Sequence, residues 1–154
     1  MRYLLDTDTC IDLLRGDVAV TAKAASVSPD DCAISTVTTY ELLAGAARCR
    51  HPREEARKVH TLVSAMHEVP FHRRAAERAG TIRAELEGRG SVIGPYDLLL
   101  AGQALADGLV LVTSNTREFS RVPGLRIEPW RFDASAEGGN PSGATAVRHR
   151  RQGT

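Results

Sequence analysis

The stretch Tyr3-Leu4-Leu5-Asp6-Thr7-Asp8 decides the fold, because a short apolar run ends in an acidic residue where a helical pattern begins. Two later stretches repeat this arrangement: Glu41 lies in the apolar segment 38–45, and Asp97 lies in the apolar segment 94–101. The apolar neighbours indicate burial, and an unpaired buried carboxylate is costly. The three stretches therefore predict carboxylates whose charge a bound cation compensates.

Short apolar runs alternate with longer helical patterns, which is typical of a parallel sheet covered by helices on both faces. Gly16 and Gly108 fit helix C-caps, and Pro95 fits a first helical position. We predict an α/β fold, a three-layer sandwich around a parallel sheet of about four to five strands. The predicted strands are 3–6, 32–35, 68–71, 110–113 and 126–128; the predicted helices are 9–15, 17–25, 38–47, 53–66, 72–88 and 95–107, with a short turn at 116–121.

The 154 residues are predicted to form one domain over residues 1–133. Gly, Ser, Ala and Pro dominate residues 134–154 without apolar periodicity, so this segment is predicted to be a disordered tail. The chain carries 20 basic and 19 acidic residues. This near-neutral balance argues against strong non-specific nucleic-acid binding but allows a local binding site.

The three cysteines lack the paired spacing of a zinc or redox site. Cys10 and Cys32 stand in apolar stretches, which indicates core packing and fits a reducing compartment. The apolar run at the N-terminus is too short for a signal peptide, and no run approaches the length of a membrane span. The sequence therefore predicts a cytoplasmic protein that does not contact a membrane.

The candidate site residues fall near the carboxyl ends of predicted strands, where parallel sheets hold ligand sites. Asp6 ends the first strand, Glu41 and Asp97 are predicted in first helical turns, and Asn115 and Glu118 follow the fourth strand. Each has an ordinary structural explanation, such as a cap or Asx-turn for Asp6 and a capping box for Glu41. Together they favour one shared site. Clustered carboxylates repel one another unless a cation is bound, and oxygen ligands without histidine indicate Mg²⁺ or Mn²⁺.

Other metal and cofactor motifs are missing from the sequence. It contains no H-E-x-x-H pattern, Walker loop or G-x-G-x-x-G motif. Asp6, Asp8 and Cys10 come near to D-x-D-x-T, the first motif of haloacid-dehalogenase-type phosphatases. That class also needs a downstream lysine, and the chain offers only Lys23 and Lys58. A phosphatase with Asp6 as its nucleophile stays open as an alternative enzyme.

Four motifs in order, at residues 4–8, 41–45, 97–101 and 112–119, resemble the PIN-domain family and, more narrowly, its VapC-type ribonuclease toxins. The similarity extends from residue 1 to about residue 130. The resemblance implies a PIN-like fold and Mg²⁺-dependent cleavage of RNA. It further implies a homodimer and inhibition by a VapB-type antitoxin.

The resemblance also suggests a role for each candidate residue. Asp6, Glu41 and Asp97 match the metal-binding acids of a PIN nuclease. The fourth acidic position of the family falls on Asn115, and Glu118 stands three residues further on as a substitute. This departure leaves the number of bound metal ions open.

The predicted function is a Mg²⁺-dependent endoribonuclease toxin that leaves 5′-phosphate and 3′-hydroxyl ends, with the metal activating the attacking water. Thr7 and Thr113 are predicted to support the metal ligands through their hydroxyl groups. Arg117 and Arg121 are candidates for RNA contact, although a solvated surface explains them equally well. The non-enzymatic alternative is a PIN-fold interaction module in which Asn115 marks lost activity.

Overall fold

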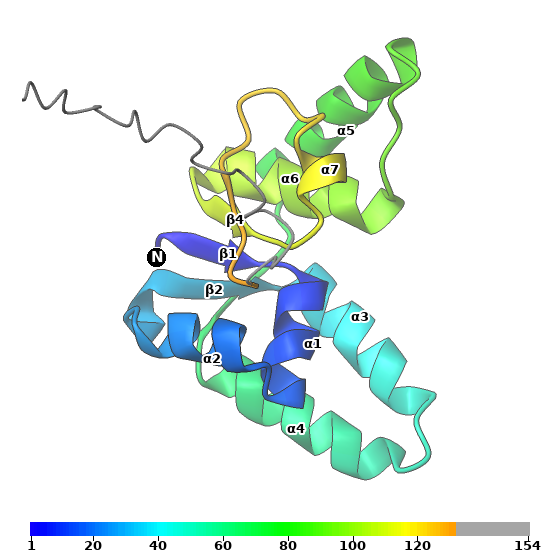
Figure 1. Cartoon of the computed structure of the whole chain (residues 1–154). Helices are drawn as coiled ribbons and strands as arrows, with labels where there is room; N and C mark the ends of the chain where they lie inside the picture. The colour runs from blue at the N-terminus through cyan, green and yellow to red at the C-terminus, as the bar shows by residue number, and fades with distance from the viewer. Residues whose placement is uncertain (132–154) are drawn as a thin grey trace, which may run out of the picture.

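The computed structural model describes residues 1–131, which form one five-stranded sheet with helices packed against it (Figure 1). All neighbouring strands are parallel, and their order is β3-β2-β1-β4-β5. The predicted α/β class and parallel sheet are confirmed. The end of the predicted domain at 133 and the predicted tail 134–154 lie outside the described residues. The strands are β1 (Tyr3–Leu5), β2 (Cys32–Ser35), β3 (His67–Val69), β4 (Val110–Val112) and β5 (Ile127–Glu128).

Each predicted helix is present, and the sequence patterns do not indicate the additional 3₁₀ helix η1. Gly16 and Gly108 are left-handed C-caps with φ of 74° and 67°, and Pro95 is the first residue of its helix, as predicted. Within residues 1–131, no helix is long and apolar enough to cross a membrane. The helices are α1 (Thr7–Arg15), α2 (Val18–Ala25), η1 (Pro29–Asp31), α3 (Thr36–Ala47), α4 (Pro52–Ser64), α5 (Arg73–Gly88), α6 (Pro95–Asp107) and α7 (Thr116–Phe119).

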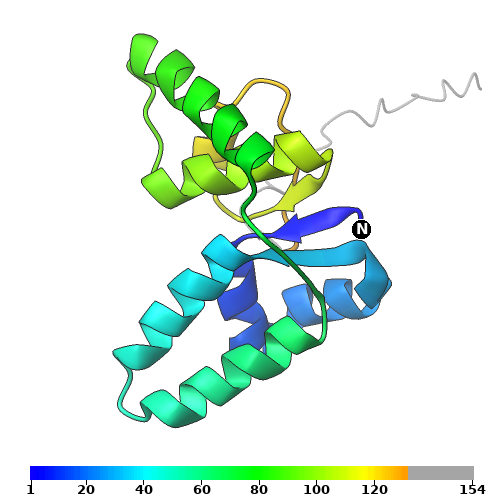
Figure 2. The ribbon, with the colours of Figure 1, turned by 180° about the vertical axis from the view of Figure 1, so that it is seen from behind.

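The sheet separates two groups of helices and two apolar cores. Helices α1 to α4 lie on one side, and α5 to α7 lie on the other (Figure 1 and Figure 2). Leu4 packs into the core beneath α5 and α6, whereas Tyr3 and Leu5 pack into the opposite core. This split follows because alternate side chains of a strand point to opposite faces. Cys10 and Cys32 are buried in the second core, as predicted.

One buried amide connects three elements near the carboxyl edge of the sheet. Gln103 of α6 is fully buried, and its Oε1 accepts a hydrogen bond from Ser35 Oγ at 2.6 Å. Its Nε2 donates to the carbonyl oxygen of Pro70 at 3.1 Å. Buried polar groups need such partners, and here both ends of the amide have one. Helix α6 is thereby held against the ends of β2 and β3.

Replacing Gly102 with Ala is expected to lower the free energy of unfolding by about 1–3 kcal/mol, because α5 and α6 touch at this position. A Cβ at residue 102 would lie 2.6 Å from the Cβ of Ala79. Gly80→Ala is the matched control on α5, where nothing lies within 4 Å of the added Cβ. That change should raise stability by roughly 0.5–1 kcal/mol. Denaturant titrations measure both, and equal effects would contradict the close packing.

Candidate active site

Three acidic side chains converge at the carboxyl edge of the sheet, each from a different part of the chain. Asp6 directly follows β1, Glu41 lies on the helix after β2, and Asp97 lies at the start of α6. Burial raises the pKa of Asp97, and the negative charges of Asp6 and Glu41 both act on it and raise its pKa further. The structure therefore brings together the three acids that the sequence singles out.

Asp6 is the most deeply buried of these acids, with 4% of its surface exposed. Its Oδ1 accepts a hydrogen bond from the backbone N–H of Thr9 at 2.7 Å, so Asp6 caps helix α1. Burial raises the pKa of Asp6, and hydrogen bonds from Thr113 and Thr9 partly oppose that rise. Asp6 is thus both a helix cap and a carboxylate held at the end of a core strand.

Glu41 lies one turn further along α3 than the sequence predicts. Helix α3 begins at Thr36, because the hydroxyl of Ser35 at the end of β2 caps it. The capping box expected over residues 38–41 is therefore wrong, and so is the placement of Glu41 in the first turn. Glu41 is partly buried, and its Oε2 accepts a hydrogen bond from Thr7 Oγ1. This contact ties α3 to the start of α1.

Asp97 is half-buried and is the third residue of α6. Its pKa is raised to about 7, first by burial and then by a hydrogen bond with Glu118 and the charges of Glu118, Asp6 and Glu41. Asn115 Nδ2 donates to Asp97 Oδ2 at 3.4 Å. Without a bound cation, Asp97 therefore keeps its proton to a higher pH than an ordinary aspartate does.

Both candidates for the fourth position approach Asp97. Asn115 precedes α7 without capping it through its side chain, and its backbone N–H donates to Thr113 Oγ1 at 3.0 Å. Interaction with Glu118 contributes to the raised pKa of Asp97, and Glu118 Oε2 accepts a hydrogen bond from the backbone N–H of Gly94 at 3.5 Å. The buried hydroxyl of Thr113 thus connects Asp6 with the Asn115 side of the site.

The structure places the remaining predicted residues outside this cluster. Asp8 is exposed, and its charge contributes to the raised pKa of Asp6. Arg117 is exposed on α7. Arg121 donates from Nη1 to the carbonyl oxygen of Val92 at 2.9 Å, so it braces the loop before α6. The RNA contacts predicted for the two arginines stay predictions.

The donor set suits a hard divalent cation, because carboxylate and amide oxygens are the ligands that Mg²⁺ and Mn²⁺ prefer. Burial is the main cause of the raised pKa of Asp97, and the negative charges of Glu118, Asp6 and Glu41 add to it; a cation would offset those charges. Within residues 1–131, no group of three or more His, Cys, Asp or Glu side chains is arranged to hold an ion as it stands. Binding would therefore have to draw the carboxylates closer and displace the proton of Asp97.

In the cation-free protein, the contribution of Asp97 to stability is expected to be lost as the pH rises from about 4 to about 7. The pKa of Asp97 is about 7 in the folded chain against 3.8 for an ordinary aspartate, so the folded state binds more protons in this interval. The stability that Asp97 contributes therefore falls with pH over this interval and stays constant above about 7. Thermal melts in EDTA measure this for the parent and for Asp97→Asn. The difference between the two curves should shrink toward pH 4, and parallel curves would contradict the raised pKa.

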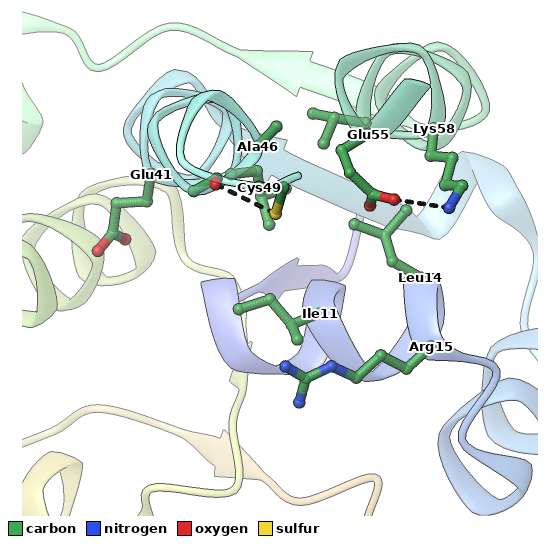
Figure 3. Close-up of a pocket in the computed structure, with 11 residues that line it drawn as sticks. Ile11, Leu14, Arg15, Glu41, Ala46, Cys49, Glu55 and Lys58 are labelled. Atoms are coloured by element: carbon green, nitrogen blue, oxygen red, sulfur yellow. Dashed lines mark hydrogen bonds and ion pairs between the residues drawn. The ribbon is translucent and has the colours of Figure 1, made fainter. Parts of the chain in front are cut away.

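A pocket of about 330 Å³ opens beside the site, between α1, α3 and α4. Figure 3 shows Glu41 at one side of it, and the paired Glu55 and Lys58 of α4 at the other. Glu41 therefore belongs both to the acidic cluster and to the edge of a mainly apolar pocket. The apolar lining residues include Ile11, Leu14, Leu42 and Val59.

Comparisons with known proteins agree with this fold. The sequence model of the PIN domain family matches residues 3–125, so the chain belongs to this family. Its relatives include the tRNA(fMet)-specific endonuclease VapC of Salmonella typhimurium, 37% identical over 130 residues, with 84% of this chain and 98% of the relative covered. Ribonuclease VapC2 of Rickettsia felis is 31% identical over 137 residues, with the same coverage.

The chain is also similar to solved structures of VapBC complexes. DNA-bound VapBC from Salmonella typhimurium matches with a TM-score of 0.81 and 37% identity, covering 85% of this chain and 99% of that one. VapBC2 from Rickettsia felis, bound to a DNA fragment, matches with a TM-score of 0.80 and 29% identity over 85% of this chain and 100% of that chain. The predicted resemblance to VapC nucleases is confirmed, and a nuclease is favoured over the phosphatase alternative.

Proposed function

We propose that this chain is a Mg²⁺-dependent endoribonuclease and the toxin of a type II toxin-antitoxin pair. The observation that carries the metal dependence is the convergence of Asp6, Glu41 and Asp97, where burial raises the pKa of Asp97 and the neighbouring negative charges raise it further. The names of the relatives, an endonuclease specific for tRNA(fMet) and a ribonuclease, support RNA as the substrate class. Mn²⁺ is expected to replace Mg²⁺, since both prefer oxygen ligands.

Three acidic side chains are proposed to bind the cation, and neighbouring groups hold two of them in position. Asp6 and Asp97 would bind it, and Glu41 would bind it directly or through water. When bound, the ion supplies activation of water and neutralisation of charge on the phosphate. The Thr7 hydroxyl holds Glu41, while the cap to Thr9 holds Asp6 in place. These contacts keep two of the three ligands oriented before substrate arrives.

Attack by water on phosphorus should break the bond to the 3′ oxygen and leave 5′-phosphate and 3′-hydroxyl ends. The purified chain, incubated with bacterial RNA, is expected to cut only when Mg²⁺ or Mn²⁺ is present, and EDTA should stop the reaction. Ligation of adaptors that require a 5′-phosphate identifies the ends. Cleavage that persists in EDTA, or products with a 2′,3′-cyclic phosphate, would contradict this mechanism.

The same proposal includes a VapB-type antitoxin as partner. Similarity to chains of the VapBC structures from Salmonella typhimurium and Rickettsia felis supports it. The apolar pocket beside Glu41 is suited to apolar side chains of an inhibitory segment that also covers the acids. We place both proteins in the cytoplasm, where RNA is available. The homodimer stays a prediction, and sedimentation equilibrium of the purified chain measures it.

A further inference from the structure

Two exposed tyrosines stand at the rim of the candidate active site. Tyr40 of α3 is 55% exposed and Tyr96 of α6 is 40% exposed, although both side chains are large and aromatic. Each directly precedes an acid of the site, Glu41 in the first case and Asp97 in the second. The two rings are therefore carried by the same helical turns as two of the proposed metal ligands.

The tyrosines also touch each other across the two helices. Their ring centroids are 5.7 Å apart with planes inclined by 52°, and the two hydroxyl oxygens are 3.3 Å apart. The hydrogen bond with Tyr40 raises the pKa of Tyr96, and the charge of Glu41 adds to this rise. The pair is thus one aromatic surface that lies within electrostatic reach of the acidic cluster.

A purely structural role explains this pair poorly. An exposed hydrogen bond between two hydroxyls adds little to stability, because water competes for both groups. Helix α6 is already held by the buried Gln103 amide and by its close packing on α5 at Gly102. Exposed aromatic area beside a functional site is instead typical of a binding surface.

We propose that Tyr40 and Tyr96 form a stacking surface for an unpaired RNA base next to the phosphate that is cut. This inference rests on the proposed nuclease function. The two rings present an uncharged aromatic face, so they are suited to contact a base rather than the RNA backbone. Aromatic rings stack on bases in loops and single strands, where a base can leave its neighbours.

The test compares Tyr40→Leu and Tyr96→Leu with Tyr40→Phe and Tyr96→Phe. Leucine removes the aromatic face but keeps apolar bulk, whereas phenylalanine keeps the face and removes the hydroxyl. Cleavage of a short single-stranded RNA should show KM raised roughly 10-fold by each leucine, with kcat changed by less than about 3-fold. The phenylalanine variants should cut like the parent. Thermal melts confirm that all four variants fold.

A binding measurement separates stacking from catalysis. In an Asp6→Asn background, which is expected not to cut, a single-stranded RNA that contains 2-aminopurine should lose fluorescence on binding. Adding Tyr40→Leu and Tyr96→Leu should abolish that quenching, while adding Tyr40→Phe and Tyr96→Phe should preserve it. A double-stranded version of the same RNA should show little quenching, because its bases stay stacked on one another.

Three outcomes would overturn the stacking surface. If the leucine variants cut RNA and quench 2-aminopurine fluorescence as their parents do, the stacking surface is contradicted and the nuclease proposal is unaffected. Phenylalanine variants as impaired as the leucine variants would assign the effect to the hydroxyl pair. Conversion of a dimer to a monomer by the double leucine variant, seen by sedimentation equilibrium, would assign the rings to contact with a second copy of this chain. Absence of any RNA cleavage by the parent would instead contradict the proposed function itself.

Discussion

Asp6→Asn and Asp97→Asn are each expected to reduce RNA cleavage by at least about 10³-fold while the fold is kept. Each change preserves the shape of the side chain and removes the charge that would hold the cation. Asn is also an effective N-cap, so residue 6 should continue to cap α1 through the contact that Asp6 makes with Thr9. Single-turnover cleavage of RNA at saturating Mg²⁺ measures the loss.

Asp8→Asn is the matched control for this experiment, because Asp8 is an exposed acid in the first turn of α1, the helix that Asp6 caps. It removes the same charge outside the cluster and should cost less than about 10-fold. Near-normal cleavage by Asp6→Asn or by Asp97→Asn would sink the assignment of the site. If the unchanged parent protein does not cut RNA either, the result would favour the non-catalytic PIN-fold module.

The double variant Asn115→Ala, Glu118→Gln is expected to lose at least about 10²-fold in kcat/KM. Both side chains act on Asp97: the amide of Asn115 donates to Asp97 Oδ2 at 3.4 Å, and interaction with Glu118 contributes to the raised pKa of Asp97. We expect Asn115 to act nearer the cation and Glu118 to act through water. Asn115 makes no side-chain cap to α7, so its replacement should cost little stability.

The single variants divide the roles. If Glu118 supplies the fourth carboxylate, Glu118→Gln alone should cost about 10²-fold, and Asn115→Asp should be tolerated or should tighten metal binding. If Asn115 is the neutral ligand, Asn115→Ala should cause the loss in kcat/KM and Glu118→Gln should leave kcat/KM nearly unchanged. Glu85→Gln, an exposed acid on α5, controls for the charge change. Full activity in the double variant would confine the chemistry to Asp6, Glu41 and Asp97.

The main elements could be predicted because their signals are local. Three-residue apolar runs such as Val110–Val112 are buried strands, and Gly16 and Gly108 end helices because they adopt positive φ. Parallel strands also share one carboxyl edge. The sequence alone therefore predicts one shared site for acids that follow separate strands, such as Asp6.

The start of α3 shows where local signals mislead. Thr38 and Glu41 satisfy a capping-box pattern, yet Ser35 begins the helix one turn earlier. Ser35 is buried and also donates to Gln103 of α6, so its position depends on a helix nearly seventy residues later in the chain. Tertiary contact selects between two acceptable caps, and a sequence window that holds only one helix cannot include that contact.

The sequence by itself determined the succession of strands and helices along the chain, the buried runs and the acids that follow them. These features depend on side-chain periodicity and on residues close in the chain. The tertiary structure alone decided the pKa of Asp97, the pairing of Tyr40 with Tyr96 and the approach of Glu118 to the site. Each of these depends on distances between elements far apart in sequence. Charge interactions and ring contacts vary steeply with such distances, and packing of the core sets them.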